Sequence, residues 1–389
     1  IYILGPGNIG SFLAHSLRSV PAPPPVTLLF HRPKFVTQWK KANETISLRT
    51  DGIIEHCKGV EGRLIRSANG SPSTAHGNQE SRASNESNLG ADDPIYNLVV
   101  TVKASNTVAA LNRVKHRLRP ESTILFLQNG MGVLDDVNKT IFPDIEHRPN
   151  YIQGIVSHGI FASRAFSIVH AGPGTIALGI LPRHPVARQQ NPRINLDQKH
   201  SEQWAPSSRY LLRALTRVPK LAAAGFPPAD LLQLQLEKLA VNAIINPLTV
   251  LFDCRNGDIL HNFACTRVMR LLISEISLVI RSLPELQGIP NVNLRFAPDR
   301  LEKMVFSIAR KTSSNYSSML QDIRLGKGTE IDYINGYIVK RGEEIGVRCL
   351  MNYMLQQMIK GKQQIKMRET VGYVPLDSVR NPGLKDESN

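Results

Sequence analysis

The feature that most constrains this chain is a glycine-rich turn between a strand-like and a helix-like segment at its beginning. The apolar stretches Ile1–Leu4 and Val26–Phe30 predict strands, and the pattern from about Ile9 to Ser19 predicts a helix between them. In the pattern G-x-G-x-x-G, the first glycine permits a tight turn, the second lets the backbone approach a pyrophosphate, and the third allows close helix–strand packing. This context favours a dinucleotide site over an ordinary glycine-rich turn. The residues predicted to surround the pyrophosphate are Gly5, Pro6, Gly7, Asn8, Ile9 and Gly10.

The residues after the second predicted strand indicate which dinucleotide binds. An Asp or Glu at this place would bind the ribose hydroxyl of NAD, whereas a cation suits the additional phosphate of NADP. Here the chain has His31 and Arg32, with Lys34 close behind. The sequence therefore predicts NADPH as the cofactor, and the alternative is a solvated basic turn without this role.

The order of predicted elements indicates an α/β protein with two domains. Strands and helices alternate at first, and from about residue 231 the periodicity is helical. We expect a Rossmann-type NADPH-binding domain over residues 1–229, an all-α substrate domain over 230–373 and a flexible tail over 374–389. Polar insertions at about 67–93 and 183–203 interrupt the first domain. Further strands are predicted at 96–102, 123–127, 153–158 and 175–178, and helices at 107–117, 231–251, 263–282, 298–324 and 330–346.

Charge and cysteine usage narrow the class of protein. The formal net charge is +15, which suits an anionic ligand such as a phosphorylated cofactor or an acidic substrate. No nucleic-acid-binding motif accompanies that charge, and no apolar run is long enough for a membrane span, so neither partner is expected. The four cysteines are widely spaced and form no C-x-x-C pair, so no metal site is expected.

Polar residues inside apolar surroundings predict a second group of functional side chains. Lys103 and Asn129 each follow a predicted strand, where ligands of open α/β sheets bind. Lys238, Asn242 and Asn246 are spaced i, i+4, i+8 and share one face of an otherwise apolar predicted helix. Pro247 has no N–H, so we expect a kink there that frees the carbonyl of residue 243 and re-aims Asn246. The alternative for Lys238 is a solvated lysine on an amphipathic helix.

These stretches together resemble the ketopantoate reductase (2-dehydropantoate 2-reductase) family. The match covers nearly the whole chain apart from the two insertions and the tail. Its most specific blocks run from Glu237 to Thr249, from Ser317 to Ile323, and from Thr329 to Gly336, and Gln128-Asn129-Gly130 adds to them. The resemblance implies a Rossmann domain followed by a helical domain similar to the C-terminal domain of 6-phosphogluconate dehydrogenase.

The resemblance also implies roles for individual residues. Lys238 would be the general acid, and Glu330 a second catalytic or substrate-orienting group. Asn242, Asn246 and Ser318 would hold the substrate, while Lys103 and Asn129 would lie where cofactor and substrate meet. Taken alone, Glu330 would be a surface carboxylate near a helix start. The implied activity is NADPH-dependent reduction of ketopantoate to (R)-pantoate, in pantothenate and coenzyme A biosynthesis.

Two other functions remain open at this point. One is reduction of a different 2-oxo acid, and the other is a non-catalytic role of a related chain in mitochondrial gene expression. Retention of all five implied site residues of the helical domain favours catalysis. We expect a monomer or homodimer. The cytoplasm is the favoured compartment, with the mitochondrion as the alternative, because a targeting segment upstream of Ile1 would not be visible.

Overall fold

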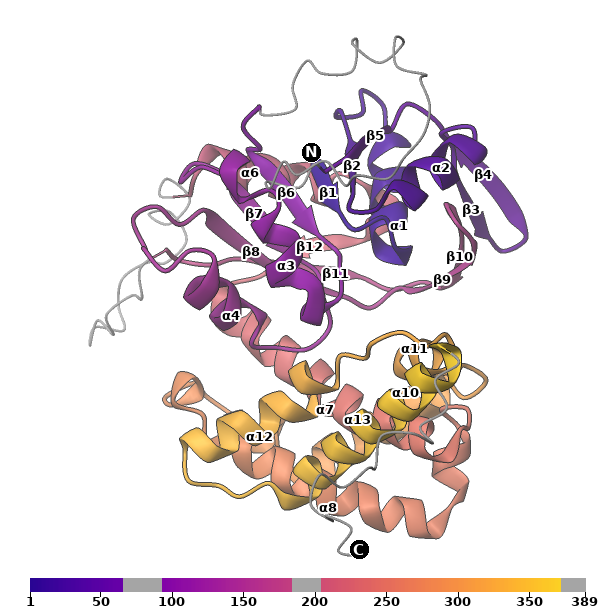
Figure 1. Cartoon of the computed structure of the whole chain (residues 1–389). Helices are drawn as coiled ribbons and strands as arrows, with labels where there is room; N and C mark the ends of the chain where they lie inside the picture. The colour runs from indigo at the N-terminus through magenta and orange to yellow at the C-terminus, as the bar shows by residue number, and fades with distance from the viewer. Residues whose placement is uncertain (66–92, 184–203, 372–389) are drawn as a thin grey trace, which may run out of the picture. The chain divides into compact units, whose positions relative to one another are not determined.

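The computed structural model describes residues 1–65, 93–183 and 204–371 (Figure 1). Its contacts divide the chain into two compact units, Ile1–Leu236 and Glu237–Asn389. The division falls inside helix α7 (Pro228–Phe252), whereas the sequence analysis began the helical domain at residue 230. The predicted insertions, apart from Asp93 and Arg183, and the predicted tail lie outside the described residues.

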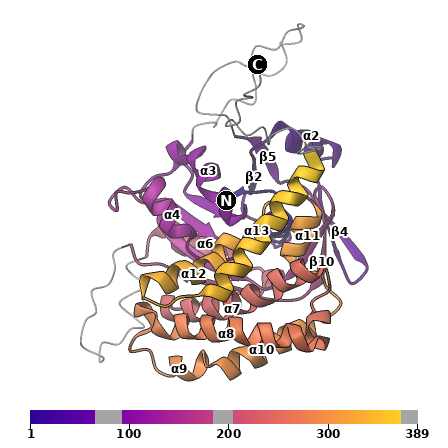
Figure 2. The ribbon, with the colours of Figure 1, turned by 60° about the horizontal axis from the view of Figure 1, so that its bottom comes forward.

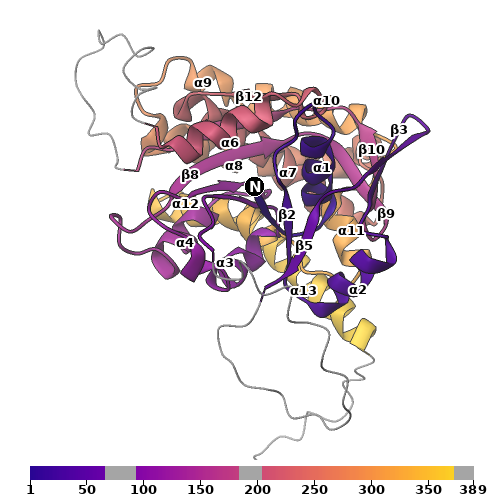
Figure 3. The same ribbon diagram turned by 90° about the horizontal axis from the view of Figure 1, so that it is seen from above.

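The first unit is built on an eight-stranded sheet in the order β12-β11-β8-β7-β6-β1-β2-β5. Figure 3 shows its strands β8, β2 and β5 from above. The six strands from β8 to β5 pair in parallel, and β11 pairs antiparallel with β8. The chain runs from β1 to β2 and β5 on one side of β1 and then crosses to β6 on its other side, which makes this the switch point of the sheet. The strands are β1 (Tyr2–Leu4), β2 (Thr27–Phe30), β5 (Glu61–Leu64), β6 (Asn97–Val100), β7 (Thr123–Phe126), β8 (Asn150–Val156), β11 (Ile176–Ile180) and β12 (Ala223–Gly225).

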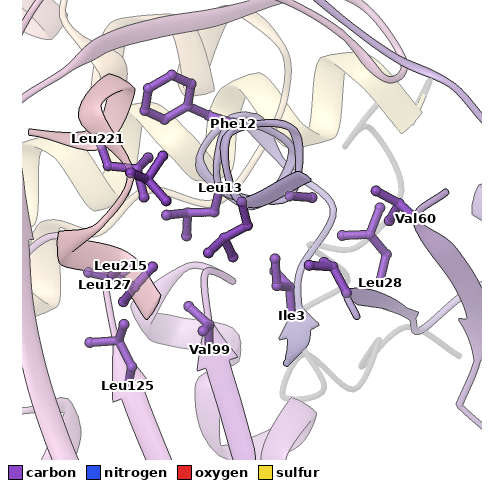
Figure 4. Packing of buried hydrophobic residues seen from close by; sticks show 14 of the residues in the cluster. Ile3, Phe12, Leu13, Leu28, Val60, Val99, Leu125, Leu127, Leu215 and Leu221 are labelled. Atoms are coloured by element: carbon purple, nitrogen blue, oxygen red, sulfur yellow. The ribbon is translucent and has the colours of Figure 1, made fainter. Parts of the chain in front are cut away.

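Helix α1 (Asn8–Arg18) supplies much of the core of this unit. Its buried Leu13 lies toward Ile3 of β1 and Val99 of β6, whereas buried Phe12 points away from these two strands (Figure 4). Leu215, near the end of α6, and Leu221 close the same cluster. Because α1 packs directly on the strands, the turn that precedes it is fixed in position. The other helices of the unit are α2 (Pro33–Lys41), α3 (Thr107–Asn112), α4 (Val133–Thr140) and α6 (Pro206–Thr216).

A second sheet in the first unit, in the order β4-β3-β10-β9, was not predicted from the sequence. Its edge strand exposes both Ile53 and Ile54, at 69% and 56%, so the strand lacks the apolar–polar alternation on which the prediction relied. His158, which follows β8, and His170 of this sheet contact the ring of Phe12 and each other. The strands are β3 (Ile46–Thr50), β4 (Ile53–Cys57), β9 (Gly159–Arg164) and β10 (Ser167–Gly172).

The second unit is helical, and its helices α8, α12 and α13 pack against one another (Figure 2). Two predictions were wrong in detail. The helix expected over 298–324 is two helices, because a polar segment ends the first and Ser317 caps the second. The last helix, α13, was missed because its polar and methionine-rich sequence has a weak apolar stripe. The helices are α8 (Phe263–Ser282), α9 (Val292–Arg295), α10 (Pro298–Lys311), α11 (Ser318–Arg324), α12 (Asn335–Glu344) and α13 (Leu350–Val371).

Across the described ranges, no helix combines the length and the apolar character that crossing a membrane would require.

Candidate active site

The glycine turn after β1 has the geometry that a pyrophosphate site requires. Gly5 has a φ of +113°, which side chains rarely allow, and Thr101 Oγ1 donates to its carbonyl oxygen at 2.7 Å. A Cβ on Gly10 would lie 2.0 Å from that oxygen. A Cβ on Gly7 would instead meet no heavy atom of the described residues within 4 Å, so the backbone there leaves space for a ligand. The three glycines therefore divide into two that maintain the turn and one that leaves space.

The amino end of α1 is suited to an anion. Gly7 occupies the N-cap position, and no side chain in the described part of the chain caps this end of the helix. The first turn of a helix leaves N–H groups without helical partners, and the helix dipole favours negative charge there. Asn8 is bonded through its Nδ2 to the carbonyl oxygen of Ile160 at 3.3 Å. The residues present at this turn fit a dinucleotide phosphate.

The carboxyl end of β2 carries a cluster of cations. His31 follows the strand, and Arg32 is the exposed N-cap of α2. Arg113, at the end of α3, donates through Nη1 to the carbonyl oxygen of His31 at 3.0 Å. Burial, and then the charges of Arg32 and Arg113, lower the pKa of His31. The sequence analysis missed Arg113, because only the β6-β1-β2 order brings α3 next to the end of β2.

Lys103 and Asn129 follow β6 and β7 at the same edge of the sheet as the glycine turn. Both residues are partly exposed, and hydrogen bonds to one hydroxyl group link their two loops. Thr107 Oγ1 donates a hydrogen bond to the carbonyl oxygen of Lys103 at 3.2 Å. The same hydroxyl accepts a hydrogen bond from Gln128 Nε2 at 2.9 Å. The predicted cofactor residues of the first unit therefore lie along one edge, at the ends of β2, β1, β6 and β7.

In the second unit, α7 presents the predicted polar face. Lys238, Asn242 and Asn246 lie on one uninterrupted helix, so the spacing of i, i+4, i+8 places them on the same side. Lys238 and Asn242 are half-buried and Asn246 is buried. Burial lowers the pKa of Lys238 from 10.5 to about 8, while the nearby charge of Glu330 acts in the opposite direction. The structure therefore brings the two predicted catalytic residues together.

Glu330 is positioned by the residues on both sides of it. The preceding residue, Thr329, is buried, and both its N–H and its hydroxyl donate to Gln363 Oε1 of α13, at 2.8 and 2.9 Å. A short 3₁₀ turn, Ile331–Tyr333, follows. Glu330 itself is half-buried. A carboxylate in this setting can accept a hydrogen bond from a ligand while it interacts with the Lys238 ammonium.

Ser318 begins α11 and is exposed, whereas its neighbour Ser317 is buried and structural. Ser317 Oγ accepts from the N–H of Leu320 at 3.1 Å and from Thr249 Oγ1 of α7 at 2.7 Å. The sequence analysis did not single out Thr249 or assign Ser317 this role. Together they fix the start of α11, and with it Ser318, to the end of α7.

Asn256 is a further polar residue that the sequence analysis missed. Its Nδ2 donates to Thr312 Oγ1 at 2.9 Å, and its N–H donates to the carbonyl oxygen of Asn315. Within the described residues its buried Oδ1 has no hydrogen-bond partner. Buried polar atoms are nearly always paired, so this oxygen is a candidate ligand contact. The Asn256-Gly257 dipeptide after a long helix was the available sequence signal.

Comparison with known proteins agrees with this geometry. The sequence profile described as ketopantoate reductase PanE/ApbA matches residues 1–183, and the profile of its C-terminal domain matches residues 230–363. A probable 2-dehydropantoate 2-reductase of Schizosaccharomyces pombe is 31% identical over 93% of this chain and 96% of that protein. The chain belongs to the ketopantoate reductase family. It is thus an oxidoreductase with the Rossmann-like and helical domains of that family.

Two other similar proteins carry different names. A ketoisovalerate reductase of Gibberella fujikuroi is 28% identical over 87% of this chain and 77% of its own length. A D-mandelate dehydrogenase, solved with NADH and anilino(oxo)acetate, has a TM-score of 0.69 at 18% identity and covers 94% of this chain and 99% of its own. The structural likeness supports the fold. The sequence relatives of this chain are thus named for more than one 2-oxo acid.

Proposed function

We propose that the chain reduces 2-dehydropantoate to (R)-pantoate with NADPH, in pantothenate and coenzyme A biosynthesis. The observation that carries this proposal is Lys238, an ammonium on the apolar helix α7 that interacts with Glu330 and whose pKa is lowered by burial to about 8. A general acid works best when its pKa lies near the working pH. Among members of this family, such a group suits proton delivery to a ketone oxygen.

The residues of the second unit have complementary tasks in this proposal. As the ketone is reduced, its oxygen gains negative charge, and Lys238 donates a hydrogen bond and then a proton to that oxygen. Such proton transfer accelerates a reaction by ~10²–10⁴-fold. Asn242, Asn246 and Ser318 donate neutral hydrogen bonds to the carboxylate of the substrate. Glu330 accepts a hydrogen bond from the hydroxyl group at the far end of the substrate.

The cofactor set of the first unit fits NADPH. The open backbone at Gly7 and the uncapped end of α1 suit the pyrophosphate. Arg32, with Arg113 close to the same strand end, suits the additional phosphate of NADPH. When bound, the nicotinamide supplies the hydride. Lys103 and Asn129 are proposed to lie where cofactor and substrate meet.

Reversing the charge of Arg32 should change the choice of cofactor. In Arg32→Asp we expect the kcat/KM for NADPH to fall ~10–100-fold, the loss of a charge-assisted hydrogen bond, while that for NADH rises or stays level. His31 and Lys34 make a weakened preference more certain than a complete switch. Steady-state rates with both cofactors at one ionic strength provide the measurement.

The matched control for this test is Lys139→Asp, which makes the same change of net charge at an exposed position in the last turn of α4. Its ratio of NADPH to NADH activity should stay at the wild-type value. An unchanged ratio in Arg32→Asp itself would show that Arg32 does not contact the phosphate.

Reduction of another 2-oxo acid is the second candidate function, favoured by the similarity to a ketoisovalerate reductase. NADPH oxidation should be measured with ketopantoate, ketoisovalerate and trimethylpyruvate, which lacks only the hydroxyl of ketopantoate. A site that hydrogen-bonds the hydroxyl should prefer ketopantoate over trimethylpyruvate by ~10²-fold or more in kcat/KM. In Glu330→Gln, this preference should shrink.

The outcomes of this panel separate the candidates. Equal rates with ketopantoate and trimethylpyruvate would exclude recognition of the hydroxyl, and faster reduction of ketoisovalerate would assign the chain to that substrate. Absence of NADPH oxidation with all three acids would favour the non-catalytic alternative.

A further inference from the structure

Pro247 leaves one carbonyl group of helix α7 without its helical hydrogen-bond partner. In an α-helix, the N–H of residue i bonds to the carbonyl of residue i−4, and proline has no N–H. Pro247 lies inside α7, so the carbonyl of Ala243 loses that bond. Ala243 is fully buried, where an unpaired carbonyl is costly. Asn335 Nδ2, from the first turn of α12, donates to this oxygen at 2.9 Å.

Asn335 is part of a buried chain of hydrogen bonds that continues through two further helices, α13 and α8. Its Nδ2 also donates to Asn352 Oδ1 of α13 at 3.0 Å, and Asn352 Nδ2 donates to Glu275 Oε2 of α8 at 2.8 Å. The Glu275 carboxylate accepts the N–H groups of Met351 and Asn352 as well, at 2.9 and 3.0 Å, and so caps the amino end of α13. Asn335 and Asn352 are both fully buried. The amide that meets the α7 carbonyl is therefore held from a second side.

The position of this bond matters for the candidate active site. Ala243 directly follows Asn242 and precedes Asn246 on α7, and Asn335 follows Glu330 by five residues across a short 3₁₀ turn. The bond thus connects the helix that carries Lys238 to the segment that carries Glu330. Thr329 is held on the opposite side by Gln363, which restricts Glu330 from both directions.

We propose that Asn335 is a positioning residue, which uses the carbonyl freed by Pro247 to set the placement of Glu330 against the Lys238 face of α7. This inference rests on the proposed roles of Lys238 and Glu330. It assigns Pro247 a purpose as well, because the proline exposes the carbonyl to which the neighbouring segment binds. Any residue with an N–H at position 247 would compete with Asn335 for that oxygen.

The experiment compares wild type, Asn335→Leu, Pro247→Ala and the double variant. Leucine keeps the branched shape of asparagine, with a larger volume, and removes the donor, and alanine at position 247 returns a helical partner to the Ala243 carbonyl. We expect Asn335→Leu to lower both the melting temperature and kcat, the latter about tenfold, which corresponds to ~1.4 kcal/mol in the activation barrier. In the double variant, the melting temperature should recover substantially, whereas kcat should not.

A second readout separates positioning from a purely structural role and does not depend on the substrate. The pKa of Lys238 is measured by the pH dependence of its acylation rate, followed by mass spectrometry. Because Glu330 raises that pKa against the effect of burial, displacement of Glu330 should lower the pKa of Lys238 below its wild-type value in both Asn335 variants. Pro247→Ala alone is the control for altered helix geometry.

The outcomes are distinguishable from failure of the proposed function. If the double variant regains both wild-type kcat and the wild-type pKa of Lys238, Asn335 serves stability alone and the inference is wrong. If wild type reduces no 2-oxo acid tested, the proposed function fails, and the pKa comparison still decides the role of Asn335. If Asn335→Leu does not fold, the double variant, in which the carbonyl is paired again, gives the same two answers.

Discussion

Lys238→Ala should lower kcat by ~10²-fold or more, because it removes the proton donor for the ketone oxygen. The protein should stay folded, since loss of this lysine removes a charge that burial already disfavours. Binding of NADPH to the glycine turn should be unaffected. The measurement is steady-state kinetics with ketopantoate, together with cofactor titration and thermal unfolding.

The pH dependence of the wild type gives an independent check on Lys238. The pKa of this amine is lowered to about 8, and only the protonated form can donate. Reduction should therefore be fastest below that pH and decline above it, while oxidation of pantoate, which needs the neutral amine, should show the opposite dependence. For the Lys238→Ala experiment, the exposed Lys303 of α10 provides the matched control, and Lys303→Ala should keep wild-type kcat. A folded Lys238→Ala protein with near-normal turnover would remove this lysine from the mechanism.

Gly10→Ala should disrupt the glycine turn, whereas Gly7→Ala should leave the fold intact. At position 10 the new Cβ would lie 2.0 Å from the carbonyl oxygen of Gly5, which is backbone and cannot rotate away. Overpacking costs ~1–3 kcal/mol or more, and alanine returns only ~1 kcal/mol in helix propensity. We therefore expect a clear loss of stability in Gly10→Ala, visible as a lower unfolding temperature of the first unit and weak cofactor binding.

The comparison with Gly7→Ala separates folding from binding. A Cβ on Gly7 meets no heavy atom within 4 Å, so the unfolding temperature should match wild type. The same methyl group would occupy the space through which a pyrophosphate approaches the backbone, and the KM for NADPH should rise about tenfold, the effect of ~1.4 kcal/mol. Wild-type affinity for NADPH in Gly7→Ala would place the pyrophosphate elsewhere.

Features that depend on local backbone chemistry could be predicted from the sequence alone. The turn at Gly5–Gly10 requires glycine for steric reasons that act within a few residues, so its pattern identified the first βαβ unit. The face of Lys238, Asn242 and Asn246 follows from the 3.6-residue period of a helix, and α7 confirms it. The effect of Pro247 on residue 243 was also predictable, since the missing N–H is a property of proline.

Only the tertiary structure decided which groups meet across long sequence separations. The donor to the Ala243 carbonyl is Asn335, 92 residues away, and Arg113 reaches His31 across 82 residues. Such partners have no signature in local periodicity, because a hydrogen bond depends on where the fold brings two atoms. For the same reason the second sheet and the pairing of Thr249 with Ser317 were missed. The sequence determined which residues carry reactive or hydrogen-bonding groups. Packing determined the neighbours that change the properties of those groups, as the pKa of Lys238, lowered by burial, shows.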